Sequence, residues 1–376
     1  MPSSTSNSSI QEDQRLIPSR SWIGMGIMAL VFALLLTGLW EYHWRSQGYY
    51  PTLNDNRGLW AQQRARVDKE PDGTIVVGAS RTLFDFHLKT YEKAFGQKPI
   101  QLSTVGTNIN PYLHDIADNT DFRGTLLVGV TPGLFFVPVG MPIKRSRGNV
   151  KYYKNLSINQ QVSQHLGMFL ERRLAFLLEY ELSLPSLIKS VKLPNRAKFK
   201  KPRPTPPYFM DITEDRQGIM TQKTEKDKAF QKHIQEIWIP LITPPPTPPI
   251  FTPAQFKKII EKSIVKTLTR TRAAIKKIQD RGGKVILIRF PSTEKVRATE
   301  NKYSPRKANW DRVQKALKAP GIHFEDYPTL RGFKCPEWSH LNGKDAKIFT
   351  ERLVPIIKQK LQALKSPARP SSRAKK

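Results

Sequence analysis

The sequence predicts an α/β fold. We expect three layers, α/β/α, in which the middle layer is a mainly parallel five-stranded sheet. One N-terminal transmembrane helix precedes this body, and a helical, proline-rich insert interrupts it. Three observations indicate this. A long uncharged stretch lies near the N-terminus, short apolar runs alternate with helical patterns, and many of the 30 prolines fall in two clusters near the middle of the chain. With 376 residues, the chain is long enough to bury one large core.

The uncharged stretch runs from Trp22 to Trp40 and has the sequence ALVFALLL at its centre. Its length is sufficient to cross the hydrocarbon core of a bilayer as a helix. Aromatic residues crowd its ends, as is usual at the level of the lipid headgroups: Trp22, Trp40, Tyr42 and Trp44. Because no small-residue cleavage site follows it, an uncleaved anchor is favoured over a signal peptide.

The chain is therefore expected to have four parts. They are a short cytoplasmic tail over 1–21, a transmembrane anchor over 22–40, an extracytoplasmic domain over 41–364 and a disordered basic tail over 365–376. Positive charges on the two sides of the anchor nearly balance, so they do not set its orientation. Long domains translocate largely regardless of charge, which favours a domain exported from the cell inner membrane into the periplasm.

The net charge of +31 lies entirely beyond residue 40. It makes the domain attractive to polyanions such as phospholipid headgroups, acidic envelope polysaccharide or nucleic acid. No zinc-finger spacing or RNA-recognition signature is present, so no nucleic-acid partner is expected. The single cysteine excludes an internal disulfide.

Apolar runs that alternate with helical patterns predict the sheet. The expected strands are 74–78, 99–105, 125–130, 284–291 and 321–327. The expected helices are 83–95, 110–119, 253–281, 307–318 and 345–364. This alternation is typical of parallel strands joined by right-handed crossovers.

An insert at about 150–252 separates the third and fourth strands. Residues 153–193 carry apolar side chains at helical spacing, and we expect that stripe to be ordinary core: Leu166, Phe169, Leu170, Leu174 and Leu177. Two proline-rich pieces follow, 200–209 and 243–253, with a polar stretch between them. They are expected to form semi-rigid spacers or a surface excursion.

Three side chains with matching chemistry are expected at one edge of the sheet. Ser80 directly follows the first strand, His340 lies in the loop between the last strand and the last helix, and Glu337 precedes that histidine by three residues. Carboxyl ends of parallel strands share one edge, where the sites of such sheets lie. A histidine oriented by a carboxylate can activate a serine hydroxyl near neutral pH.

In this arrangement the sequence resembles the SGNH (GDSL-like) hydrolase superfamily, and within it the membrane-anchored bacterial members linked to polysaccharide O-acylation. Four blocks carry the resemblance in order along the chain: Gly78-Ala79-Ser80, Gly106 in STVGTN, Gly129-Val130-Thr131, and Glu337-Trp338-Ser339-His340. It extends from about Leu59 to Leu364, apart from the proline-rich excursion. The resemblance implies an SGNH/flavodoxin-like sheet.

The resemblance also implies a role for each matching residue. Ser80 would be the nucleophile, His340 the general base and Glu337 the carboxylate that orients it. The amides of Ser80 and Gly106 and the hydroxyl of Thr131 would form the oxyanion hole. Ala79, Thr131 and Glu337 stand where the family usually has Asp, Asn and Asp. These departures also fit a catalytically inactive member of the family.

Several residues near the site have alternative interpretations. Asn108 is a substitute oxyanion donor or substrate contact, and Arg81 is either a contact for an anionic substrate or a surface ion-pair partner. Ser80 alone also fits a helix N-cap, and Asp326 or Asp345 could replace Glu337. Residues expected to be structural are Cys335, His87 and His114.

The functional expectation is a membrane-anchored serine esterase or O-acyltransferase that acts on acyl esters of cell-envelope polysaccharide and needs no metal or cofactor. Expected partners are the membrane, an acylated polysaccharide or other acyl ester, and, from the resemblance only, a multi-pass membrane acyltransferase as donor. The alternative is a catalytically inactive envelope protein of the same fold that binds glycan or organises an acylation complex.

Overall fold

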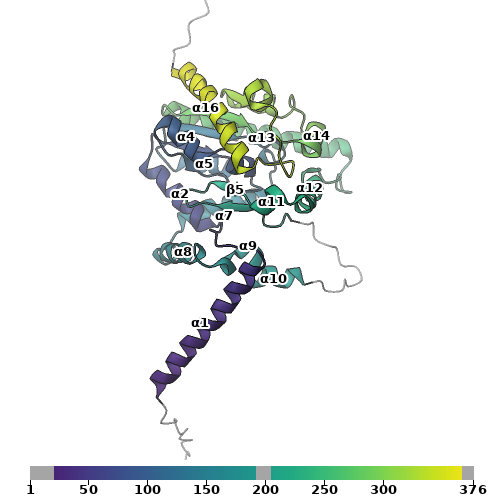
Figure 1. The fold of residues 1–376 in the computed structure, drawn as a ribbon. Helices are drawn as coiled ribbons and strands as arrows, with labels where there is room; N and C mark the ends of the chain where they lie inside the picture. Colours follow the sequence, from purple (N-terminus) through teal and green to yellow (C-terminus); the bar gives the residue numbers. More distant parts are fainter. Residues whose placement is uncertain (1–20, 192–204, 366–376) are drawn as a thin grey trace, which may run out of the picture. The chain divides into compact units, whose positions relative to one another are not determined.

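The computed structural model describes residues 21–191 and 205–365 (Figure 1). The expected cytoplasmic tail, apart from its last residue, lies outside the described residues, as do residues 200–204 and nearly all of the basic tail. The chain divides after Tyr50 into two units.

The described part of the first unit contains one helix, α1 (Trp22–Ser46). Its N-cap is Ser21, whose hydroxyl accepts the backbone N–H of Gly24 at 3.2 Å. Among the described residues, α1 is the one helix whose length and composition would allow it to cross a membrane. The helix continues past the expected end at Trp40 by more than one turn.

The second unit is built on the predicted parallel sheet, which is confirmed. Its strands are β1 (Thr74–Val77), β2 (Ile100–Gln101), β3 (Thr125–Gly129), β6 (Lys284–Arg289) and β7 (Gly321–His323). Their order is β2-β1-β3-β6-β7, and each neighbouring pair is parallel. The carboxyl ends of all five strands therefore lie along one edge.

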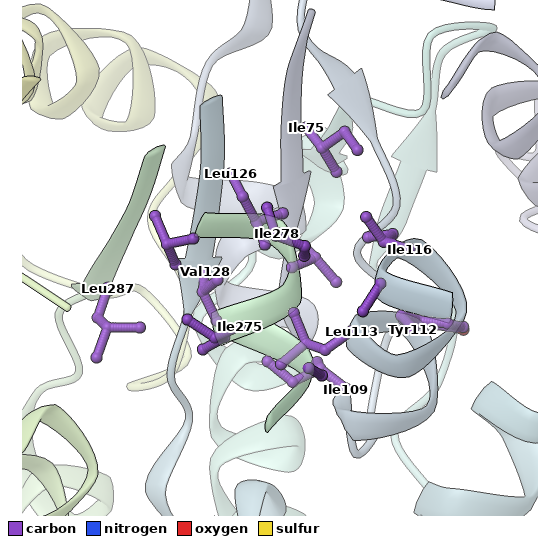
Figure 2. Packing of buried hydrophobic residues seen from close by; sticks show 14 of the residues in the cluster. Ile75, Ile109, Tyr112, Leu113, Ile116, Leu126, Val128, Ile275, Ile278 and Leu287 are labelled. Atoms are coloured by element: carbon purple, nitrogen blue, oxygen red, sulfur yellow. The ribbon is translucent and has the colours of Figure 1, made fainter. Parts of the chain in front are cut away.

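Successive residues of a strand point to opposite faces of the sheet, so these apolar strands have two faces to bury, and helices cover both. Val77 and Val128 face a cluster with α5 (Asn110–Asp118) and α13 (Pro253–Asp280), which Figure 2 shows from close by. Val76 and Leu127 face a second cluster with α16 (Gly343–Lys365). The remaining α-helices outside the insert are α2 (Arg57–Lys69), α3 (Ser80–Asp85), α4 (Leu88–Phe95), α6 (Pro132–Phe135), α14 (Glu294–Tyr303) and α15 (Trp310–Leu317), and two short 3-10 helices, η2 (Phe324–Asp326) and η3 (Pro328–Leu330), follow β7.

The helix expected over 83–95 is two helices, α3 (Ser80–Asp85) and α4. The break lies at Phe86 and His87, whose backbone is extended. His87 caps α4, since its Nδ1 accepts the backbone N–H of Thr90 at 3.2 Å. This is a structural role, as expected for His87.

The insert holds more regular structure than its composition predicts. Helix α7 (Met141–Lys154) leads into the insert, whose helical elements are α8 (Ile158–Glu171), η1 (Ala175–Leu177), α9 (Glu179–Leu182), α10 (Leu184–Ser190), α11 (Gln222–Lys226) and α12 (Lys228–Ile242). The polar stretch between the proline-rich pieces contains an antiparallel hairpin of β4 (Met210–Ile212) and β5 (Gly218–Met220). The sequence predicts no strand or helix for residues 210–242, so the hairpin, α11 and α12 are additions to the expected insert.

The expectation that the apolar stripe of the insert is core is wrong. Leu166, Phe169 and Leu170 on α8 are exposed to solvent. The residues of α8 that face the domain are instead Met168 and Glu171. Helical spacing indicates that a stripe exists, but it does not say what covers it.

Candidate active site

Ser80 is the first residue of α3 and follows β1 after a two-residue turn. Ala79, with an extended backbone, occupies the N-cap position, and no side chain caps this helix. Ser80 is therefore not the N-cap, and its half-buried hydroxyl has no capping role. The local fold leaves this hydroxyl at the carboxyl edge of the sheet.

Two glycines at this edge make room for α3. A Cβ atom at Gly78 would lie 1.9 Å from Thr82 Oγ1, and one at Gly129 would lie 1.8 Å from the same oxygen. Neither distance is compatible with a side chain, so both positions require glycine. The close approach of Thr82 to the ends of β1 and β3 holds the start of α3, and Ser80 with it, against the sheet.

Glu337 and His340 form a buried hydrogen-bonded pair. Glu337 Oε1 accepts the backbone N–H of His340 at 2.6 Å and lies 2.9 Å from His340 Nδ1. Both side chains are fully buried. The turn that brings them together has Trp338 at φ 74°, a left-handed conformation that is rare for a bulky residue. The longer carboxylate arm of glutamate is thus accommodated by the loop.

The substitute carboxylates do not reach this histidine. Asp326 forms a forked ion pair with Arg306, and those hydrogen bonds lower the pKa of its carboxyl. Asp345 accepts a hydrogen bond from Asn342 Nδ2 at 3.0 Å. Of the carboxylates considered from the sequence, Glu337 is the one that contacts His340.

The other ring nitrogen of His340 is unsatisfied. Within the described residues, Nε2 is buried and has no hydrogen-bond partner, so no hydrogen bond joins it to Ser80 Oγ. Three aromatic rings surround the imidazole, with centroids at 4.5 Å (Phe84), 5.7 Å (Phe209) and 5.7 Å (Trp238). Phe84 lies one helical turn after Ser80, on the same face of α3. Helix α3 therefore packs against His340 through Phe84, and no hydrogen bond joins Ser80 to the imidazole.

Two of those aromatic rings come from the insert, and sequence reasoning missed both. Trp238 lies on α12 and donates its indole N–H to Glu337 Oε2. Phe209, just before β4, lies between Phe84 and Trp238 and contacts both rings. A signal was present, since Ile234, Ile237 and Trp238 recur at helical spacing within the polar stretch.

The expected oxyanion-hole residues lie at the ends of neighbouring strands. Gly106 follows β2 in a left-handed conformation with φ 58°. Thr131 follows β3 as the N-cap residue of α6, is half-buried and makes no capping hydrogen bond. Asn108 is engaged elsewhere, because its Nδ2 donates to the carbonyls of Phe135 and Val137 at 3.2 and 2.8 Å. Its amide is therefore not a free donor for a substrate.

Arg81 is an internal link and not a surface cation. Its guanidinium donates to the Ser339 carbonyl at 3.0 Å, to Ser339 Oγ at 3.2 Å and to Glu300 at 2.6 Å. Burial alone would raise the pKa of Glu300, but the charges of Arg289 and Arg81 outweigh it and lower that pKa to about 2. A buried charge network therefore joins the residue after Ser80 to the residue before His340.

Asp85, at the end of α3, is a second link to the histidine loop. Its Oδ1 accepts the backbone N–H of Leu341 at 2.9 Å, while Oδ2 is buried and has no partner among the described residues. Burial raises the pKa of this carboxyl well above its ordinary value, against the opposing effects of the Leu341 hydrogen bond and the Arg81 charge. Both ends of α3 are thus bonded to residues beside His340.

Cys335 and His114 occupy ordinary structural positions. The Cys335 thiol is buried, and that burial raises its pKa well above the usual range. His114, on α5, lies 3.9 Å from Asp118 on the same helix. Neither side chain contacts Ser80, Glu337 or His340 in the structure as described.

No protein-family model matches this chain, and no curated protein is similar to it.

Proposed function

We propose that this protein is a membrane-anchored, SGNH-like serine esterase or O-acyltransferase that acts on acyl esters of cell-envelope polysaccharide. One observation carries the proposal. The Glu337–His340 pair is buried and hydrogen bonded, its Nε2 has no partner, and it packs against the helix that begins at Ser80. A buried polar atom without a partner calls for an explanation, and a serine hydroxyl or a reacting ester would supply the missing hydrogen bond.

The reaction would have two halves. Ser80 Oγ attacks the ester carbonyl while His340 Nε2 takes the hydroxyl proton, and Glu337 stabilises the imidazolium through Nδ1. The alcohol leaves with a proton from His340, and the acyl group remains on Ser80. Water or a sugar hydroxyl then attacks the acyl-serine, giving its proton to His340, and Ser80 Oγ departs with that proton. The amides of Ser80 and Gly106 and the Thr131 hydroxyl would stabilise the oxyanion.

The site must tighten before this chemistry. His340 is enclosed by Phe84, Phe209 and Trp238, and Ser80 Oγ is not yet bonded to it. Catalytic hydrogen bonds are often long or unmade in a free enzyme and form in the complex with substrate. A movement that brings Ser80 Oγ to about 3 Å from His340 Nε2 would complete the triad.

The proposed location follows from α1 and the charge. An anchor in the inner membrane with a periplasmic domain of net positive charge would keep the site near acidic or otherwise charged glycan. A multi-pass acyltransferase would be the acyl donor if the reaction is transfer. Water access to the acyl-serine would decide between hydrolysis and transfer.

A second candidate function is a catalytically inactive protein that binds glycan or organises an acylation complex. The observation that favours it is the complete burial of both Glu337 and His340. A base that never meets solvent or substrate would be a structural hydrogen-bonded pair.

A fluorophosphonate probe separates the two candidates on the full chain in detergent. An active triad labels Ser80, Ser80→Ala and His340→Ala abolish the label, and Ser163→Ala, at an exposed serine of α8, leaves it unchanged. A wild-type protein that is folded by circular dichroism and does not label would refute the enzymatic proposal.

A further inference from the structure

Helix α8 presents an apolar stripe to solvent. The stripe consists of Ile158, Val162, Leu166, Phe169 and Leu170, of which Ile158 is 77%, Leu166 61% and Phe169 54% exposed. Ile158, Val162, Leu166 and Phe169 follow one another at intervals of four, four and three residues, and Leu170 lies four residues after Leu166, so all five lie on one face of the helix. An exposed, contiguous apolar face of this kind marks an interaction surface.

The stripe points away from the body of the domain. The inner face of α8 is formed by Met168 and Glu171, which are buried, and by Gln164, which packs against Gly58 of α2. At 100° per residue, the centre of the stripe lies on the opposite side of the helix from these three residues. Nothing in the described part of the domain covers it.

A second apolar edge lies on α10. Leu184, Ile188 and Val191 are exposed and recur at intervals of four and three residues. Figure 1 shows α8 and α10 at the same end of the domain, away from α16. The two helices together give this end of the domain an apolar surface.

This end of the domain is tied to the chain that leaves the anchor. Asn54 Nδ2 donates to the Leu177 carbonyl at 2.9 Å, and Asn54 Oδ1 accepts the N–H of Glu179 at 2.8 Å. The backbone N–H of Asn54 also donates to Glu171, the last residue of α8, at 3.0 Å. Asn54 lies only eight positions after Ser46, where α1 ends. A fully extended chain of that length reaches about 25–30 Å, so α8 is confined near the bilayer once α1 is inserted.

Basic side chains border the stripe. Arg173 lies with its Cζ 3.7 Å from the ring centroid of Phe169, and Arg172, which follows α8 directly, donates to Glu214 at 2.6 Å. Lys151 and Lys154 on the preceding helix are exposed. Guanidinium and ammonium groups beside an apolar helical face suit a surface of anionic headgroups.

We propose that α8 and α10 form a membrane-docking face whose apolar stripe enters the boundary between headgroups and acyl chains of an anionic bilayer. The proposal goes beyond the proposed chemistry and rests only on the proposed insertion of α1. Its apolar side chains would lie about 5–10 Å below the headgroup surface, as in other interfacial helices. The domain would then be held on the bilayer by two contacts, the anchor and this face.

The test uses the full chain in vesicles of phosphatidylcholine and phosphatidylglycerol. Single cysteines carrying an environment-sensitive NBD label are placed at Leu166, at Leu34 on α1 as a positive control, and at exposed Ala298 on α14 as a negative control. The wild-type chain gives the background, because its one cysteine, Cys335, is buried. Quenching is then measured with lipids that carry a doxyl group on the acyl chain.

We expect the doxyl lipid to reduce emission at Leu166 by about twofold or more, as at Leu34, and to leave Ala298 nearly unchanged. Removal of phosphatidylglycerol should weaken quenching at Leu166 and not at Leu34. A label that is quenched at Leu34 and unquenched at Leu166 overturns the docking face while the anchor stands. A blue-shifted but unquenched label at Leu166 also overturns it, because a second copy or another protein then covers the stripe.

Discussion

Trp238 donates its indole N–H to Oε2 of Glu337 while His340 lies against Oε1 of the same carboxylate. The tryptophan belongs to an insert, 99 residues before the glutamate. The insert therefore helps to orient the carboxylate that holds the histidine.

Replacement of Trp238 by phenylalanine should weaken both the fold and the site. Trp238→Phe keeps an aromatic ring next to His340 but removes the donor to a buried carboxylate oxygen, a loss of about 1–3 kcal/mol. Urea unfolding should show this, and the rate of fluorophosphonate labelling should fall as well. Trp60→Phe is the matched control, because Trp60 donates to a neutral carbonyl, that of Leu102. Equal labelling rates for wild type and Trp238→Phe would contradict the positioning role.

The buried network around Glu300 should make the fold sensitive to its removal. Glu300→Gln leaves the guanidiniums of Arg81 and Arg289 without their shared anion, at a cost of about 3–5 kcal/mol. Glu261→Gln, which breaks an exposed pair with Arg312, should change the free energy of unfolding little. Thermal melts of the wild type, Glu300→Gln and Glu261→Gln test this difference. Similar melting temperatures for the two variants would refute it.

The same glutamate should contribute to acid denaturation. Its pKa is about 2 in the folded protein, below the ordinary value near 4.5 expected when unfolded. The stabilisation is therefore complete above about pH 4.5 and is lost as the pH falls toward about 2. Urea titrations at a series of pH values should show this loss in the wild type and a shallower slope over the same window in Glu300→Gln.

Asp85 should show the opposite dependence on pH. Because burial raises its folded pKa, the protein is stabilised by protonation below the ordinary pKa near 4 and loses that stabilisation as the pH rises. Asp85→Asn keeps an acceptor for the Leu341 N–H and removes the ionisable group. The variant should exceed the wild type in free energy of unfolding at pH 8, and the difference should shrink toward pH 4. An exposed control, Asp121→Asn, should show no such trend.

Gly129 and Thr82 should be energetically coupled. Gly129→Ala places a methyl group onto Thr82 Oγ1, and overpacking of this kind costs about 1–3 kcal/mol. Thr82→Ala should cost less, because its buried hydroxyl has no hydrogen-bond partner among the described residues. In a double-mutant cycle, Gly129→Ala should be less damaging in the Thr82→Ala background. Strict additivity would show that the clash is relieved by other movements.

The sheet could be predicted from the sequence because its signals are local. Runs such as 125–130 and 284–291 are apolar, short and followed by helical patterns, which is sufficient for a buried parallel strand. The pairing of Glu337 with His340 was also within reach, since three residues in a tight loop separate them. Their catalytic roles and the part played by Ser80 stay predictions.

What the sequence did not reveal depends on contacts between distant segments. The apolar stripe of Leu166 has the same spacing whether it faces a core or solvent, so periodicity alone misassigned it. Trp238 lies in a polar, charged stretch between two proline-rich pieces, and its partner is remote in the chain. The break between α3 and α4 depends on His87, whose capping role is visible only once Thr90 is placed.

The pairing of β3 with β6 has a consequence for synthesis. Residues 125–129 pair with 284–288, so about 150 residues must emerge from the ribosome before β3 gains that neighbour. At 5–20 residues per second, this takes on the order of ten to thirty seconds. Throughout that interval β3 offers an unpaired hydrogen-bonding edge to other nascent chains. Protection of this edge by chaperones should therefore determine how much of the protein reaches its folded state.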